Sequence, residues 1–384
     1  MKYSITTNLK ASPVEPQISR INRISNKVAL PAAIPNMKTF FLSSSHRALR
    51  YLFILALTLC LYLPAVSNAA DLNFDVSSKY DDGVDNSIAI NSNRFFVEFH
   101  TSDSAFSSDI WYRFGKIDGT SVSWGRSQYS GFSGYYPAVA ISREGYILVV
   151  FSTKVNKSGS ELQYRVGGMI NPNEDVNQAI VWRTGSLFWD RGFHASISMN
   201  DNGTIVGVHE THGSSKRLYY RVGTFINPAA GDFNIAWSSG ASGIGYDDGW
   251  NPHISINNKN QVVQVHQVPG EFLTHYRRGI VTGGKIDFSE SVRYNNSAEQ
   301  PAVALLDNGR VLEVYSYFGL YSRTGNLSLS NSRDIQWSAP VQVHGDSDAW
   351  YPALAANGVY AIAIDERPRQ YTLRTELYYS VADL

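Results

Sequence analysis

The chain has 384 residues, enough to bury a large core, and its 33 lysine and arginine residues balance its 33 aspartate and glutamate residues. A formal net charge of zero provides no electrostatic field for nucleic acid or for anionic lipid surfaces, so neither is an expected partner. Tyrosine (23), phenylalanine (18) and tryptophan (8) are abundant, which favours pleated, half-buried β-structure over helical bundles.

Residues 1–70 have the pattern of an N-terminal extension that ends in a secretory signal peptide. An apolar stretch, 51–64, follows basic residues and precedes the small residues 67–70, which is the order typical of export. The stretch is shorter than the roughly 20 residues of a bilayer-spanning helix, which disfavours a membrane anchor. We therefore expect cleavage near Ala69 and a secreted or periplasmic mature chain that is not inserted in the membrane. Met37 is an alternative start.

The single cysteine of the chain, Cys60, lies inside this apolar stretch. Leu59 precedes it, whereas a lipoprotein acceptor would follow a small residue. After cleavage the chain would contain no cysteine, which excludes disulfide bonds, a thiol nucleophile and cysteine metal ligands. The mature fold must therefore be stabilised by its core and by closure of its sheets.

From residue 71 onward the chain repeats a motif with a period of about 50 residues. The motif has the form Tyr-Arg-x-Gly, with variations, and occurs at 111–115, 163–167, 218–223, 275–279, 320–325 and 377–380. Such a period indicates one supersecondary unit stacked several times.

Each repeat contains four segments with strand signatures. The first alternates small or polar residues with apolar ones, at 87–90, 138–141, 196–199, 253–256, 302–305 and 353–355. A turn, often rich in Asn, Asp and Gly, leads to a second apolar run, at 96–100, 148–151, 206–209, 263–266, 312–315 and 362–365. The Tyr-Arg motif is the third segment, and the fourth ends at Trp124, Trp182, Trp237, Phe288 or Trp337. Alternation broken by tight turns predicts antiparallel strands joined by hairpins.

Six such units predict an all-β fold, a six-bladed β-propeller of four-stranded antiparallel blades at residues 71–384, with five or seven blades as alternatives. The small-residue strand is expected innermost and the aromatic-ended strand outermost. The last unit lacks its fourth strand because the sequence stops at Leu384, and a matching aromatic segment lies at 72–74. We therefore expect the N-terminal strand to complete the last blade, closing the ring and removing exposed sheet edges.

The segments that link one unit to the next also recur. Three of them, 80–83, 189–192 and 246–249, share an aromatic-Asp-x-Gly pattern. Several links end in a proline just before the inner strand, at Pro137, Pro252, Pro301 and Pro352. At the first residue of a strand, proline removes no ladder hydrogen bond.

These repeats resemble bacterial and fungal propeller lectins of the fucose-binding kind. The likeness is carried best by residues 300–315, where a Pro-Ala-Val run, an Asp-Asn-Gly turn and a Leu-Glu-Val strand follow one another. It covers about residues 71–384, in repeat pattern rather than in close identity. The resemblance implies sugar pockets between adjacent blades. The chain departs from these lectins in carrying Tyr-Arg where they carry a Trp-rich strand.

Sugar binding requires flat aromatic faces and side chains that hydrogen-bond to hydroxyl groups. Blades three and four have the most polar repeats and supply the candidate ligand-binding residues: Trp189, Asp190, His209, Glu210, Arg221, Tyr246, Asp247, Trp250, His266, Gln267 and Arg277. Glu366 is the acceptor that follows the second strand of blade six. For the repeated arginines the alternative is architectural, each bonded to the aspartate of a link and holding blade to blade.

The sequence thus predicts a secreted, multivalent carbohydrate-binding lectin whose weak sites gain strength through avidity. Its partners would be glycans or glycoconjugates, and oligomerisation is left open. One alternative is a sialidase-like glycoside hydrolase, with the candidate acids Glu98, Glu210, Asp247 and Glu313. The nearest approach to a sialidase Asp-box, 199–205, lacks its Ser and Trp. The other alternative is a protein-binding propeller.

Adjacent aspartates occur in two links, 81–82 and 247–248. Carboxylate oxygens are the ligands that calcium prefers. Adjacent aspartates in a turn are more commonly solvated turn residues, however, and no calcium-loop spacing occurs. We therefore predict neither a metal site nor a cofactor.

Overall fold

The computed structural model describes residues 72–102, 108–153, 160–171, 175–211, 216–228, 231–238, 242–268, 270–295, 298–327, 334–345, 348–369 and 374–384. The predicted extension and signal peptide, residues 1–70, lie outside this range and stay predictions. Within the described residues, no helix is both long and apolar enough to cross a membrane.

The strands form six antiparallel sheets, the blades. Blade 1 contains β2 (Val84–Ile90), β3 (Phe95–Thr101), β4 (Asp109–Asp118), β5 (Ser121–Trp124) and β6 (Gln128–Ser133). Blade 2 contains β7 (Tyr135–Ile141), β8 (Tyr146–Ser152), β9 (Glu161–Met169), β10 (Ile180–Trp182) and β11 (Leu187–Arg191). Blade 3 contains β12 (Phe193–Met199), β13 (Thr204–Glu210), β14 (Arg217–Asn227), β15 (Asp232–Trp237) and β16 (Ile244–Asp248).

The second half of the chain continues the pattern. Blade 4 contains β17 (Trp250–Ile256), β18 (Gln261–Gln267), β19 (Thr274–Thr282), β20 (Lys285–Phe288) and β21 (Val292–Asn295). Blade 5 contains β22 (Glu299–Leu305), β23 (Arg310–Ser316), β24 (Leu320–Leu327), β25 (Ile335–Trp337) and β26 (Val341–His344). Blade 6 contains β27 (Trp350–Ala356), β28 (Tyr360–Pro368), β29 (Thr375–Asp383) and, from the N-terminal end, β1 (Ser78–Asp82).

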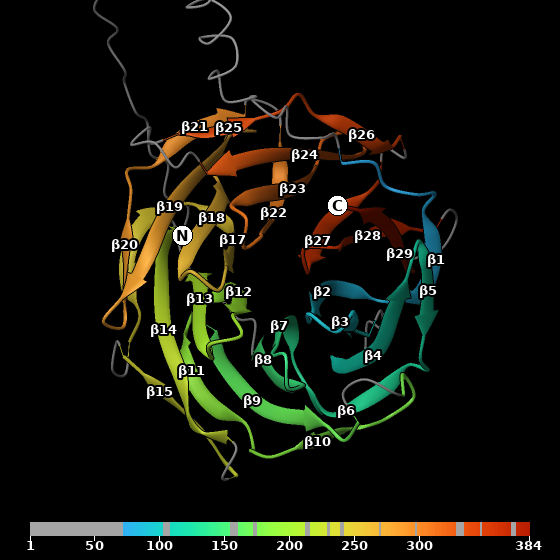
Figure 1. Ribbon diagram of the computed structural model, residues 1–384, viewed down its shortest axis with the longest axis vertical. Helices are drawn as coiled ribbons and strands as arrows, with labels where there is room; N and C mark the ends of the chain where they lie inside the picture. The colour runs from blue at the N-terminus through green and yellow to red at the C-terminus, as the bar shows by residue number, and fades with distance from the viewer. Residues whose placement is uncertain are drawn as a thin grey trace, which may run out of the picture. The chain divides into compact units, whose positions relative to one another are not determined.

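The blades stand in a closed ring around a central channel (Figure 1). The innermost strand of each blade packs on the innermost strand of the next, and β27 of blade 6 packs on β2 of blade 1. The prediction of a six-bladed propeller with small-residue strands innermost is therefore confirmed.

The N-terminal segment closes the ring, as predicted, although its strand is not the one expected. The closing strand is β1, which pairs with β29, whereas 72–74 has no strand assignment. The sequence pattern predicts residues 80–83 as a link between units. In each of the other blades the corresponding link also pairs with the third strand, as β6, β11, β16, β21 and β26. The aromatic-Asp links are therefore strands, and each places its aspartate at the border with the next blade.

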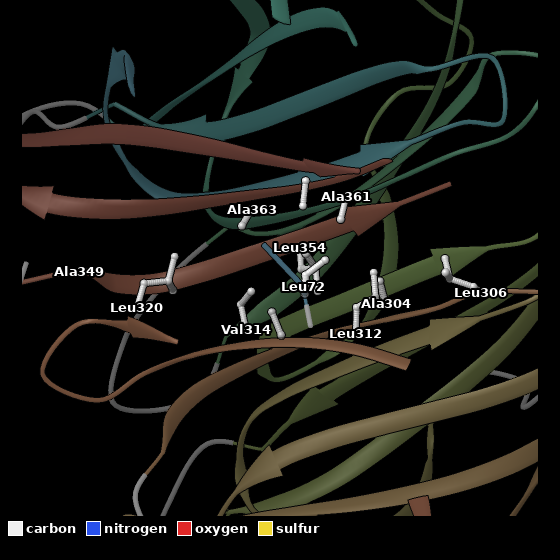
Figure 2. Packing of buried hydrophobic residues seen from close by; sticks show 12 residues of the cluster. Leu72, Ala304, Leu306, Leu312, Val314, Leu320, Ala349, Leu354, Ala361 and Ala363 are labelled. Carbon is white, nitrogen blue, oxygen red and sulfur yellow. The ribbon is translucent and has the colours of Figure 1, made fainter. Parts of the chain in front are cut away.

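Leu72 anchors the N-terminal segment between the last two blades. Its side chain is 1% exposed and packs in a cluster of leucine, valine and alanine side chains from blades 5 and 6 (Figure 2). Asp75 N–H donates to the Val381 carbonyl at 2.8 Å. Closure is thus stabilised by both apolar burial and backbone hydrogen bonding.

The small and polar residues of the inner strands satisfy the backbone of the neighbouring blade. Ser87 Oγ accepts a hydrogen bond from Val139 N–H at 3.1 Å, and Ser255 Oγ accepts one from Leu305 N–H at 3.0 Å. These N–H groups belong to strands at the channel edge of their sheets, which have no ladder partner on that side. Because an unpaired buried N–H is costly, a short hydroxyl side chain suits this face.

The glycine of the Tyr-Arg-x-Gly motif makes room for the aromatic residue of the fourth strand. Gly223 on β14 pairs with Trp237 on β15, and a Cβ atom at Gly223 would lie 2.7 Å from the Trp237 ring and 2.7 Å from the Ile235 side chain. The equivalent glycines pair with Trp124, Trp182, Phe288 and Trp337. The motif therefore records a packing requirement of the blade.

Candidate active site at the axial mouth

The repeated Asp, His and Arg residues join neighbouring blades. Asp190 on β11 lies with Oδ2 3.1 Å from His209 Nε2 on β13 of the next blade. Arg221 on β14 donates to the Trp189 carbonyl. Burial alone would raise the pKa of Asp190, but the hydrogen bond and charge of His209 outweigh it and lower that pKa. These contacts form a polar tie between blades 2 and 3.

The border between blades 3 and 4 has the same arrangement. Arg277 Nε donates to Asp247 Oδ2 at 2.6 Å, and His266 Nε2 lies 3.7 Å from the same oxygen. Burial alone would raise the pKa of Asp247, but the hydrogen bond from Arg277 and the charge of His266 lower it. Tyr246 stacks on the Phe288 ring at 4.9 Å. The aspartate and arginine of the repeat thus serve a structural purpose at this border.

The candidate acids Glu98 and Glu313 also lie inside such ties. Glu98 contacts His100 Nδ1 at 3.1 Å. Glu313 Oε2 accepts from Arg323 Nε at 2.5 Å, and its other oxygen accepts from Tyr294. Both glutamates are 0% exposed.

Between blades 2 and 3, where a sugar pocket was expected, Asp190 and His209 line a cavity together with Phe188 and Tyr219. The predicted Trp189 is not part of its lining. Trp189 is 0% exposed, and it packs edge-on against His209 at 5.5 Å. His209 and His266 are likewise buried. Three of the predicted residues, Glu210, Trp250 and Gln267, lie elsewhere, around the opening of the central channel.

Every inner strand has a β-bulge near its first residue, on the face of the ring where the inner strands begin. One bulge residue per blade has a positive φ: Asp85 (57°), Tyr136 (50°), His194 (43°), Asn251 (46°), Gln300 (49°) and Tyr351 (45°). Residues other than glycine rarely adopt a positive φ, and those that do cluster at functional sites. The six residues together line one cavity of about 110 Å³, which we call the axial mouth.

The repeat breaks at this ring. The inner strands otherwise repeat alanine, serine and branched residues, whereas the bulge position carries Asp, Tyr, His, Asn, Gln and Tyr in blade order. A position with a purely architectural role would keep one residue type. Bulges beside active sites re-aim side chains, so the axial mouth is the candidate functional site.

Glu210 lies behind His194 at the end of β13. His194 Nδ1 is 3.1 Å and Lys216 Nζ 3.2 Å from Glu210 Oε1, while Asn251 N–H donates to Oε2 at 2.8 Å. Burial alone would raise the pKa of Glu210, but these partners lower it below its ordinary value. Glu210 is therefore a buried anion with partners on both oxygens, and it lies against His194, which lines the cavity.

Asp85 and Glu366 form a second carboxylate group at the mouth. Glu366 Oε1 accepts hydrogen bonds from Asn86 N–H at 3.3 Å and from Asn86 Nδ2 at 3.2 Å. Burial, together with the nearby charge of Asp85, raises the pKa of Glu366 well above its ordinary value. Burial also raises the pKa of Asp85, although Tyr136 N–H donates to it at 3.3 Å. This side of the mouth favours protonated carboxyl groups.

Two tyrosines complete the lining. The Tyr136 ring packs edge-on against His194 at 4.5 Å. Burial and the charge of Asp85 raise the pKa of Tyr136 to about 12, so its hydroxyl stays protonated and donates hydrogen bonds. Burial and the charge of Glu366 raise the pKa of Tyr351 as well.

The repeat pattern points to Glu210, Trp250, Gln267 and Glu366 near this ring. It does not point to Asp85, Tyr136 or His194, which line the cavity. One sequence feature could have identified these residues. The proline before the inner strand recurs at Pro137, Pro252, Pro301 and Pro352, whereas the residue that precedes it changes from blade to blade.

Among the described residues, no group of three or more His, Cys, Asp or Glu side chains has an arrangement that could hold a metal ion. The paired aspartates of the links are engaged locally: Asp81 contacts Arg113 Nε at 2.7 Å, and Asp248 N–H donates to Asp247 Oδ1 at 2.9 Å.

The sequence matches no family model and no curated protein sequence. The structure is similar to that of an α-L-arabinanase from Penicillium chrysogenum solved with arabinobiose, with 9% identity, coverage of 81% of this chain and 98% of that chain, and a TM-score of 0.53. It is also similar to the NanB sialidase of Streptococcus pneumoniae, with 7% identity, 81% and 70% coverage, and a TM-score of 0.53. A protein of unknown function from Dyadobacter fermentans is also similar, with 12% identity, coverage of 82% of this chain and 98% of that chain, and a TM-score of 0.52.

At this identity the comparisons show a shared fold. They support the predicted propeller pattern and not the resemblance to fucose-binding lectins, because the carbohydrate-active neighbours are an arabinanase and a sialidase. The prediction of a lectin is therefore wrong. In the structure, the predicted residues Asp190, Asp247 and Arg277 are engaged in contacts between the blades.

Proposed function

We propose that this protein is a glycoside hydrolase whose active site is the axial mouth. The observation that carries the proposal is a pair of opposed carboxyl environments: Asp85 lines the cavity, and Glu210 lies behind His194, which lines the same cavity. Asp85 has a raised pKa and Glu210 a lowered one. Two carboxyl groups with pKa values pushed apart are the usual basis of an acid and base assignment.

Asp85 is the proton donor, because it lines the cavity and its raised pKa favours the protonated form. It protonates the oxygen of the leaving sugar as the glycosidic bond breaks. His194, oriented by Glu210, takes a proton from the attacking water through Nε2. Water and glycoside are consumed, and two hydroxyl-bearing sugars are released.

A tyrosine nucleophile, as sialidases use, is less compatible with the mouth. Tyr136 has a pKa of about 12, raised by burial and by the charge of Asp85. A nucleophilic tyrosine needs a lowered pKa or an adjacent base. Acid–base catalysis by Asp85 and His194 therefore fits the electrostatics better.

The test is a hydrolysis screen of the full chain on aryl glycosides and polysaccharides, with detection of released aryl group or reducing ends. For the substrate found, Asp85→Asn and His194→Gln should each lower kcat/KM by at least about 100-fold. Glu144→Gln, the same change in an exposed turn on the opposite face of the ring, is the control. Absence of hydrolysis, or full activity in Asp85→Asn, would overturn the proposal.

A further inference from the structure

An arc of exposed aromatic side chains lies on the face of the axial mouth, over three consecutive blades. We call Phe272, Tyr317, Phe318, Trp350 and Tyr351 the aromatic rim; they are 61%, 37%, 77%, 53% and 40% exposed, respectively. Phe272 follows β18, Tyr317 and Phe318 follow β23, and Trp350 and Tyr351 begin β27. In each blade the end of the second strand pairs with the start of the inner strand, so both lie on the same face of the ring. The rim residues therefore border the axial mouth.

The rim has no role in the core. Phe318 has a positive φ of 48° in a three-residue turn closed by Tyr317 N–H donating to the Gly319 carbonyl at 2.9 Å. A bulky residue in this conformation is strained, and at this exposure its ring contributes little to folding. Exposed aromatic clusters of this kind mark binding surfaces.

The rim is continuous with the catalytic groups. Trp350 pairs with Glu366 in the β27–β28 ladder, and Tyr351 lines the mouth itself. Gln300 connects the two blades, since its Oε1 accepts from Tyr351 N–H at 2.8 Å. A ligand that enters the mouth beside Asp85 would therefore continue over the rim.

The charge around the rim selects among ligands. The acidic residue Glu299 begins β22 beside Gln300 at this edge, so a carboxylate on the ligand would lie close to another carboxylate. Lys216 Nζ does not offset this charge, because it lies 3.2 Å from Glu210 Oε1 and is paired with it. A ligand with carboxylates would be repelled, whereas neutral sugars offer C–H faces to aromatic rings and hydroxyl groups to amides.

We propose that the aromatic rim binds the sugar units beyond the cleaved bond of a neutral oligosaccharide or polysaccharide. This inference rests on the proposed function for the position of the cleaved bond. The substrate class is thereby narrowed to uncharged glycans several units long, held along blades 4 to 6.

Binding is measured first, by affinity electrophoresis of the full chain through gels containing linear arabinan, xylan, mannan or dextran, with polygalacturonate as the anionic probe. We expect retardation by a neutral polymer and not by polygalacturonate. Trp350→Ala and Phe318→Ala should weaken this binding about tenfold each, while Trp350→Phe, which keeps a flat ring, restores most of it. Phe188→Ala removes an aromatic ring that is 50% exposed on β11 and is the matched control.

Hydrolysis separates the two proposals. On the polymer, the rim variants should lose about tenfold in kcat/KM, with no loss on an aryl glycoside of the same sugar. Rim-dependent binding without hydrolysis by the wild type would support the rim and reject the proposed function. Three outcomes would overturn the proposed role of the rim in binding. They are absence of binding to every neutral polymer, a preference for polygalacturonate, and unchanged binding in both alanine variants.

Discussion

His194 and Glu210 meet across the bulge of blade 3, with His194 Nδ1 3.1 Å from Glu210 Oε1. In the ladder, Glu210 pairs with Phe193, and His194 is the displaced residue that follows. The bulge therefore turns His194 toward the axial mouth while the regular part of the strand buries its carboxylate partner. In this position a buried anion lies behind an imidazole that lines the cavity.

The pH dependence of hydrolysis follows from Asp85. Its carboxyl group must be protonated to act as donor, and its pKa is raised above the ordinary value of about 3.9. Activity should therefore persist above pH 4 and fall as the pH rises through the raised pKa. A profile of kcat/KM against pH measures this fall. An activity that is constant from pH 5 to pH 9 would contradict the assigned role.

Glu366 should reduce the stability of the fold at neutral pH. Because its pKa is raised in the folded state, stability is greatest at low pH and declines as the pH rises above the ordinary glutamate value of about 4.3. Glu366→Gln removes this loss and should raise Tm by about 2–4 °C at pH 7, with no gain at pH 4. Thermal unfolding of both proteins at the two pH values checks the sign, and Glu144→Gln should show no such difference.

Gly223→Ala should destabilise the blade, since the added Cβ would lie 2.7 Å from the Trp237 ring. We expect a loss of about 1–3 kcal/mol in the free energy of unfolding, measured by urea denaturation. Gly168→Ala is the matched control in blade 2, because its Cβ would meet no atom nearer than 3.7 Å. Equal effects of the two substitutions would show that the close approach is not responsible.

Leu72→Ala should weaken closure of the ring. The side chain is 1% exposed between blades 5 and 6, so its truncation should cost about 2–5 kcal/mol. Val76→Ala, at a side chain that is 91% exposed, should be close to neutral. If both variants have the same urea midpoint of unfolding as the wild type, the N-terminal segment does not stabilise the last blade.

The architecture could be predicted because it depends on local signals that recur. Alternation at 138–141, the turn at 200–203 and the aromatic at Trp237 each specify a strand or hairpin within a few residues. The link strand β16 could not be predicted from the sequence, because its partner β14 already pairs with β13 and β15, which both precede β16 in the chain. Only the sheet shows that β15 and β16 pair with different parts of the same edge of β14.

The sequence by itself determined the period, the number of blades and the closure of the ring, since each blade folds from contiguous hairpins. Only the tertiary structure decided which residues form the site. Asp85, His194 and Glu366 belong to three different blades. The repeat motif gives the position of each residue within its own blade, but it does not indicate that the three lie close together. Asp85 and His194 meet because the six bulges point toward one axis. The raised pKa values of Asp85 and Glu366 arise from burial and neighbouring charges that exist only in the closed ring.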